Sequence, residues 1–291
     1  VQTIERALQV QDLLNDDLLI RLVTGLTHLP TVPSLYCTLV KELESEDVSL
    51  KRLGDILAQD VAMTARILQI VNSAFFGVAR DIRSPHQAAT LLGINMLKTL
   101  VLYVNAFGGD VGPRNVDAPI EQLRLHSIGV GSLSKRIAQD LGFSKEQVDA
   151  FVSGMLHDIG YLVLYEVEGH FRKARQLANE QSISSVEAER QLLGTTHAEI
   201  GAYLLGIWGL PTRIVEAVAF HHAPGRLARP PSLPLFAVHC ANYLWGSCFS
   251  SFPALPKEAF DLQYWPVADL PSRLDTWRCL VDELKHSEFP T

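Results

Sequence analysis

The sequence predicts an all-α fold, a multi-helix bundle with an N-terminal helical lobe, and two observations carry that prediction. Apolar residues recur at helical spacing along most of the 291 residues, whereas the alternation typical of strands is almost absent. Serine, aspartate and proline stand where these apolar segments begin, as they do at helix starts. Hydrophobic residues make up 47% of the chain, which is enough to bury a sizeable core.

Composition argues against several classes of partner. The net charge is −7, so a broad basic face for nucleic acid is not expected. No apolar run reaches the roughly 18 residues of a membrane span, so we expect no membrane partner. The four cysteines lack CxxC spacing, which favours a reducing, cytoplasmic location over a disulfide framework. Because the chain starts at Val1 and not at methionine, we expect a piece of a longer protein.

The first helix is expected over residues 1–28, where leucines recur at near-helical spacing among charges. It is either an ordinary first helix or a linker helix that joins something N-terminal. Two prolines within 29–33 break it, because proline does not fit a helix interior. Ser49 and Asp60 are then expected to cap two short helices, since their side chains can accept from free backbone N–H groups.

Glycine and proline divide the following segment. Gly77 is a predicted C-cap, Ser84 and Pro85 open the next helix, and Gly93 ends it. A strongly apolar helix is expected directly afterwards, over 94–106.

The turn-rich stretch 108–118 is the best internal boundary, because it carries Gly-Gly-Asp and Gly-Pro. A long helix over 119–141 is expected to follow. Ser144 is expected to open a second long helix that runs through His157 and Asp158. The remaining expectations are helices at 169–181, 185–193, 197–208, 211–222 and 235–246, a loop at 224–234, an irregular stretch at 252–271, and Ser272 as the cap of a last helix.

His157 and Asp158 stand inside an apolar run that reads as buried helix. Burying two ionisable groups is costly unless they are paired or bound to metal. Neutral imidazole and carboxylate are good ligands for divalent transition metals, and an aspartate can bridge two ions that activate water and hold a phosphoryl oxygen. A buried polar network without metal is the alternative. The sequence offers as partners His126, His197, His221 and His222.

Two blocks resemble the signature of HDOD domains. The first is Gln59–Gly77, the second runs from Ser84 to Leu97, and Leu-Pro-x-x-Pro at 29–33 is similar to the family's usual start. The resemblance covers about 27–245. It implies a helical relative of the HD phosphohydrolases in bacterial signal transduction, a group in which many members have lost the metal-binding residues.

The resemblance also implies a division of the chain. Its expected parts are a linker helix at 1–28, an N-terminal HDOD lobe at 29–108, an HD-like metal-site lobe at 119–246 and a C-terminal helical segment at 247–291, with 29–246 as one HDOD domain. The linker helix is similar to the helix that follows a receiver domain in response regulators. Expected partners are therefore other signalling proteins and an N-terminal receiver domain.

In metal-binding relatives the resemblance implies one or two divalent ions, iron, manganese, nickel or zinc. The two implied ligand sets are His126, His157 and Asp158 for one ion, and Asp158, His197, His221 and His222 for a second. Asn242 stands where an aspartate is expected, and a neutral amide is the weaker ligand. The first ion would then be looser, or replaced by a hydrogen bond from Asn242 to a ligand histidine.

The loop after His221 and His222 bears on catalysis. Related cyclic-di-GMP phosphodiesterases carry Gly-Tyr-Pro there, and this chain does not. It carries Arg226 and Arg229, either as phosphate contacts or as solvated loop charges. No lysine or acid stands beside Asp158 to serve as a proton donor. The expected function is therefore a non-catalytic signal-transduction output module with a divalent metal in an HD-type site.

Two alternatives stay open. One is a metal-dependent phosphohydrolase or phosphodiesterase acting on a nucleotide or cyclic dinucleotide, with Asp158 as the catalytic residue. The other is a helical protein-interaction scaffold without metal. Two further interpretations are attached to particular residues: His239 is either a donor behind the ligands or a packing residue, and 72–76 is either core or a docking surface for a partner.

Overall fold

The chain is helical wherever the structure, a computed structural model, shows regular elements. It describes residues 17–24, 34–43, 49–73, 76, 78, 81–108, 120–166, 169–227, 231–248 and 269–288. These ranges contain no strand, so the all-α prediction is confirmed for them. The chain divides into two compact units, the first made of Val1–Leu29 and Val111–Glu283, the second of Pro30–Asp110 and Leu284–Thr291.

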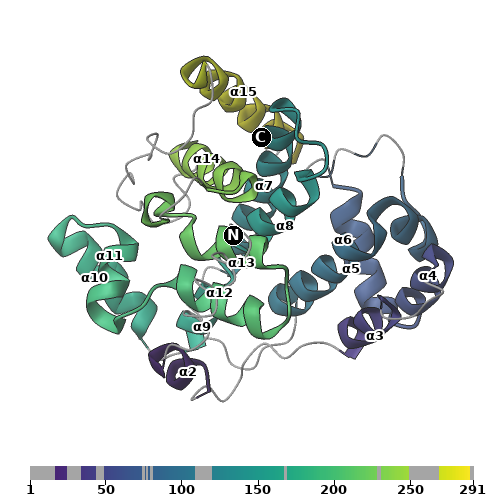
Figure 1. Ribbon diagram of the computed structural model, residues 1–291, viewed down its shortest axis with the longest axis horizontal. Coiled ribbons are helices and arrows are strands. Elements are labelled where there is room, and N and C mark those ends of the chain that lie inside the picture. Colours follow the sequence, from purple (N-terminus) through teal and green to yellow (C-terminus); the bar gives the residue numbers. More distant parts are fainter. Residues whose placement is uncertain are drawn as a thin grey trace. The chain divides into compact units, whose positions relative to one another are not determined.

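The second unit is built around its longest helix. Its elements are α3 (Ser34–Leu43), α4 (Leu50–Ala58), α5 (Val61–Val71) and α6 (Pro85–Gly108), and α6 packs against the other three (Figure 1). Both predicted caps are confirmed. Ser49 Oγ accepts from the N–H of Arg52 at 3.2 Å, and Asp60 Oδ1 accepts from the N–H of Met63 at 2.9 Å.

Helix α6 joins two predicted helices. The backbone leaves helical conformation at Gly93 (φ 66°, ψ 174°), so the predicted break is a kink at which glycine's freedom is required. By length and composition Pro85–Phe107 could cross a membrane, with a mean hydropathy of 1.4, which the sequence expectation of no such run did not foresee. Because 56% of that stretch is buried within the protein, its apolar character fits a core helix.

Asn72 closes the loop that follows α5. Its Nδ2 donates to the carbonyl of Ile82 at 2.8 Å, and its Oδ1 accepts from the N–H of Ile82 at 2.7 Å. Phe76 is buried. Phe76 therefore belongs to the core, as one of the two interpretations had it, whereas Asn72 is exposed and the docking interpretation stays a prediction for it. Ala74 and Phe75 lie outside the described ranges, as does the predicted C-cap Gly77.

The first unit carries the remaining helices. They are α2 (Asp17–Thr24), α7 (Ile120–Asp140), α8 (Gln147–Leu156), α9 (Gly160–Glu166), α10 (His170–Gln181), α11 (Ser185–Leu193), α12 (His197–Ile207), α13 (Thr212–Phe220), the 3₁₀ turn η2 (Pro224–Arg226), α14 (Leu233–Cys248) and most of α15 (Leu270–Glu288). Helix α7 packs against α8 and α14, and α13 packs against α8, α12 and α14. Of the predicted helix at 1–28, the structure describes α2, which contacts α12.

Glycines allow α7 to approach its neighbours closely. A Cβ on Gly154 of α8 would lie 2.7 Å from the Cα of Gly131 on α7, and a Cβ on Gly129 would lie 2.0 Å from the Trp245 ring of α14. Any residue larger than glycine at these two positions would clash with the neighbouring helix. This packing brings the segment of α7 that holds His126 next to the end of α8.

Two predicted features of α8 are wrong. The helix begins at Gln147 without a side-chain cap, and Ser144 lies in a turn that closes through the N–H of Glu146 and the carbonyl of Phe143 at 3.2 Å. The helix also ends at Leu156, so residues 157–159 form a turn before α9. His157 and Asp158 therefore stand at a helix end and not within a helix.

Two other helices begin earlier in the sequence than predicted, and a proline explains the difference in both. Helix α14 begins at Leu233, with Pro234 at its second position, and α15 begins at Leu270, ahead of the predicted cap Ser272. Proline is tolerated in a first turn, because its missing N–H would have no partner inside the helix. Both prolines were predicted to lie in the preceding loops, whereas they lie in the first turns of the two helices.

Candidate metal centre

Three helix ends and two helix interiors bring the predicted ligands together. His126 lies on α7, His157 and Asp158 in the turn after α8, His197 at the first position of α12, His221 and His222 in the turn after α13, and Asn242 on α14. Neighbouring residues of an intact helix point about 100° apart. The turn after α8 releases His157 and Asp158 from that constraint, so that both reach one site.

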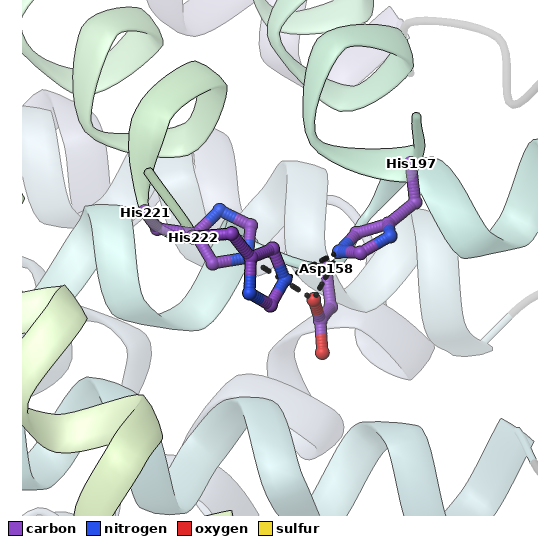
Figure 2. Close-up of side chains that lie close together, drawn as sticks. All are labelled: Asp158, His197, His221 and His222. Carbon is purple, nitrogen blue, oxygen red and sulfur yellow. Dashed lines mark hydrogen bonds and ion pairs between the residues drawn. The ribbon is translucent and has the colours of Figure 1, made fainter. Parts of the chain in front are cut away.

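The carboxylate of Asp158 is the meeting point of the cluster, and Figure 2 shows it beside His197, His221 and His222. Its two oxygens face different histidines. Oδ2 lies 3.1 Å from Nε2 of His157 and 3.4 Å from Nε2 of His126. Oδ1 lies 3.3 Å from Nε2 of His197 and 3.6 Å from Nε2 of His221. Each oxygen of the carboxylate thus lies beside a different pair of histidines.

The histidines also face one another within each set. Nε2 of His126 lies 3.2 Å from Nε2 of His157, and Nε2 of His197 lies 2.9 Å from Nε2 of His222. Two groups result, one of His126, His157 and Asp158, the other of Asp158, His197, His221 and His222; within each, one ligand atom per residue lies within 4.8 Å of the others.

Backbone carbonyls fix which nitrogen of two rings carries the proton. Nδ1 of His157 lies 2.7 Å from the carbonyl of Gly154, and Nδ1 of His221 lies 2.7 Å from the carbonyl of Val218. A carbonyl only accepts, so Nδ1 is the donor and the neutral ring turns its Nε2 lone pair toward Asp158.

Two hydrogen-bond acceptors that face each other in a buried site repel unless a proton or a metal ion lies between them. The Nε2 lone pairs of His157 and His221 approach the Asp158 carboxylate, and Nε2 of His221 is buried without a hydrogen-bond partner. A proton or a metal ion would relieve this contact, and imidazole with carboxylate is a donor set that suits a divalent transition metal. The residues present therefore fit such an ion.

The charge states of Asp158, His126 and His221 favour ligation, whereas His197, whose pKa is raised, must first lose a proton. Burial raises the pKa of Asp158, but the neighbouring histidine rings outweigh it and hold that pKa well below its usual range. Burial lowers the pKa of His126 to about 4 against the attraction of Asp158. Burial, followed by the proximity of His222, holds the pKa of His221 well below its ordinary value. An ionised carboxylate and neutral imidazoles are the forms that bind metal.

Glu189 on α11 is a buried acid that holds His197. Its Oε2 lies 2.7 Å from Nδ1 of His197 and accepts the backbone N–H of the same residue at 2.8 Å. Burial lowers the pKa of His197, but Glu189 and Asp158 outweigh it and raise that pKa to about 10. The expectation of no acid near the site missed this residue. Glu189 lies between Glu187 and Arg190 in a segment whose charges are typical of a solvated helix face, so no sequence pattern indicated it.

Asn242 and His239 contact the ligands from α14. Asn242 hydrogen-bonds the ring of His126, and whether this bond takes the place of an ion stays a prediction. His239 is buried, and its Nδ1 lies 2.7 Å from the carbonyl of His221. His239 therefore holds the backbone of the turn that carries the histidine pair.

The predicted phosphate contacts have another environment. Arg226 Nη1 lies 3.2 Å from Oε1 of Glu199, a buried carboxylate that also binds Arg190 with two contacts of 2.8 Å. The guanidinium of Arg226 is thus engaged with an acid, which does not favour its assignment to phosphate. Arg229 lies outside the described residues.

Helix α9 contacts both the ring and the backbone of His197. The ring of Tyr161 stacks on that of His197 at 4.1 Å and 14°. Directly before it, Gly160 packs on the backbone of α12, where a Cβ would lie only 1.9 Å from the carbonyl oxygen of His197. The turn with Asp158 is thereby held against the start of α12.

Comparison with known proteins identifies the family of this chain. It belongs to the HDOD domain family, whose model matches residues 29–224. The match confirms the resemblance drawn from the two sequence blocks.

Relatives extend the comparison. An uncharacterized protein of Treponema pallidum (strain Nichols) is 28% identical over 195 residues, which cover 67% of this chain and 37% of that protein. The chain spans 37% or less of the length of the curated relatives it matches. An HDOD domain protein of unknown function from Geobacter sulfurreducens is 28% identical, with a TM-score of 0.65 over 92% of this chain and 97% of that chain.

A second solved structure shows the fold alone. It is a candidate phosphohydrolase from Shewanella amazonensis SB2B, 22% identical, with a TM-score of 0.67 over 94% of this chain and 93% of that chain.

Proposed function

We propose that this chain is an HDOD signal-transduction module whose centre holds a pair of divalent metal ions bridged by Asp158. The proposal rests on the position of the Asp158 carboxylate, whose two oxygens face different histidines. Its Oδ2 faces His126 and His157, whereas its Oδ1 faces His197 and His221. Facing acceptors in a buried site are costly without a cation, and two such sets meet at one carboxylate.

The residues would divide the work as follows. His126, His157 and Oδ2 of Asp158 would hold one ion, and Oδ1 of Asp158 with His197, His221 and His222 would hold the other. When bound, such a pair supplies a water activated at neutral pH and a clamp for phosphoryl oxygens. The protein's own contribution is orientation, because carbonyls, Glu189 and Asn242 fix the imidazole rings before any ion enters.

A non-catalytic role is supported by the state of the polar groups around the centre. Glu189 is buried and bonded twice to His197, so it is engaged in positioning. Arg226 is paired with Glu199. Neither is presented as a proton donor or a phosphate contact.

One observation favours a second candidate, a metal-dependent phosphohydrolase acting on a nucleotide or cyclic dinucleotide. A carboxylate shared by two metal sites is typical of hydrolytic centres that attack phosphoesters. Asp158 would then be the catalytic residue, and the similar protein from Shewanella amazonensis SB2B is named for that class of reaction.

Metal analysis tests the proposal. The protein is purified without oxygen, loaded with Mn²⁺ or Fe²⁺, desalted and analysed. We expect about two ions per chain, and loss of both in Asp158→Asn, because that carboxylate serves both sets. Protein that retains no metal under these conditions would contradict the proposal and leave the scaffold interpretation.

A turnover screen separates the two candidates. The loaded protein is offered nucleotides, linear phosphodiesters and cyclic dinucleotides. Bound metal without hydrolysis supports the signalling module. Hydrolysis that disappears in both His157→Ala and Asp158→Ala would replace it with the phosphohydrolase.

A further inference from the structure

We propose that Glu189 is a positioning residue that makes the His197 side of the centre the tighter of two metal sites, so that the ions bind in a fixed order. This inference rests on the proposed metal pair and adds to it an asymmetry that arises from a residue outside the ligand set.

Glu189 holds both the backbone and the ring of one ligand. Its Oε2 lies 2.8 Å from the amide nitrogen of His197 and 2.7 Å from Nδ1, and its Oε1 lies 3.0 Å from the same Nδ1. The residue is only 1% exposed. Because one carboxylate bonds to two points of His197, the ring can neither rotate nor shift its proton to Nε2 without breaking a buried contact.

Glu189 lies beside the N-terminus of α12. His197 is the first residue of α12, and Thr196 caps that helix by accepting from the N–H of Glu199 at 3.3 Å. A helix N-terminus stabilises a nearby anion. Once Nε2 of His197 is deprotonated, Glu189 keeps the remaining proton on Nδ1 and so directs the Nε2 lone pair into the centre.

Three other rings bond to neutral groups. His157 and His221 donate from Nδ1 to neutral carbonyls, and His126 bonds to the neutral amide of Asn242. The His197 set also has four candidate ligands, whereas the His126 set has three. The carboxylate of Glu189, the number of ligands and the preorganised ring of His197 all favour tighter metal binding by the His197 set.

A purely structural role for Glu189 is the competing explanation, since the carboxylate also ties α11 to α12. A structural role and a positioning role of Glu189 predict different effects of its substitution. Loss of a tether lowers the stability of the fold and weakens both sites together, whereas loss of positioning weakens one binding step selectively.

The test is a Mn²⁺ titration of the whole chain by anaerobic equilibrium dialysis, with a parallel urea denaturation curve of the metal-free protein. Wild type is expected to bind in two steps. Glu189→Gln should weaken the tighter step by about 10–100-fold and change the weaker step by no more than about twofold. Asn242→Asp should tighten the weaker step alone, because it adds a carboxylate beside His126.

Glu187→Gln is the matched control. Glu187 lies on the same helix, is exposed, and bonds to the side chain of Gln191 at 3.1 Å, so its variant should bind as wild type does. If Glu189→Gln leaves both steps unchanged, or weakens both equally, the positioning role is wrong and the metal pair stands. If wild type binds no Mn²⁺, the proposed function fails, and this inference fails with it.

Discussion

The proton on each imidazole ring determines what the centre can hold. Carbonyls of Gly154 and Val218 keep the protons of His157 and His221 on Nδ1, and their Nε2 atoms face Asp158. These bonds are made by the chain itself and need no ion. A site with its lone pairs already aligned loses little conformational freedom on binding, so preorganisation is a property of the apoprotein.

Gly160→Ala tests the contact that places the ligands. The added Cβ would lie 1.9 Å from the carbonyl oxygen of His197, so α9 and α12 must separate. We expect a loss of about 1–3 kcal/mol in the free energy of unfolding, together with weaker metal binding. Gly246→Ala is the control, because a Cβ there meets nothing within 4 Å. Urea denaturation measures both, and equal stability of the two variants would contradict the contact.

The sequence could indicate the ligands but not what supports them. His157 and Asp158 stand out because ionisable groups are rare in apolar runs. Glu189 is invisible to that reasoning, since its neighbours in sequence are charged and its role depends on the loop that folds α11 onto the start of α12. Asn242 was found by family order, and its bond to His126 followed from three-dimensional packing.

At the level of helices, the ends of the elements build the site. Caps were predictable where a side chain acts within its own turn, as at Ser49 and Asp60. Ends without such a cap were not: α8 ends at Leu156, and the turn that follows it packs against α12. The sequence pattern there remains helical, so periodicity alone could not show the break.

Two substitutions compare a real cap with a predicted one. Asp60→Ala removes the acceptor for the N–H of Met63 and should cost about 1 kcal/mol in the free energy of unfolding. Ser144→Ala should stay within about 0.5 kcal/mol, because Ser144 is exposed and does not cap α8. Denaturation midpoints measure the pair, and a large loss in Ser144→Ala would overturn the observed start of α8.

Helix α15 is fastened to α7 by one carboxylate. Asp140 Oδ2 accepts from Nε1 of the buried Trp277 at 3.1 Å and also binds Arg273. Asp140→Ala leaves the indole N–H unsatisfied and should cost about 1–3 kcal/mol. The exposed pair of Asp275 with Arg278 is the comparison, for which Asp275→Ala should cost less than about 1 kcal/mol. Similar losses in the two variants would argue against this anchor.

At the level of the whole molecule, the candidate metal centre lies within the first unit, and all the residues that would bind metal come from that unit. The all-α fold and the HDOD family were both predictable, because helical periodicity extends over the chain and the signature blocks are long. The second unit contributes the kinked α6 and the loop closed by Asn72, which were visible in the sequence only as a glycine and an asparagine.

Metal should stabilise the folded chain as a whole. An ion that binds the native state and not the unfolded chain adds about 2.7 kcal/mol at a concentration 100 times its Kd. We expect Mn²⁺ to raise the Tm of wild type, a chelator to reverse the rise, and Asp158→Asn to abolish it. A rise of the same size in Asp158→Asn would place the ion elsewhere.

The bridge at Asp158 is tested most directly by electron paramagnetic resonance of the Mn²⁺-loaded protein. Two ions that share one carboxylate lie about 3.5–4 Å apart and couple magnetically. We predict the spectrum of a coupled pair at full loading, preceded at partial loading by the signal of a single ion. A spectrum of isolated, uncoupled Mn²⁺ at full loading would contradict the bridged centre.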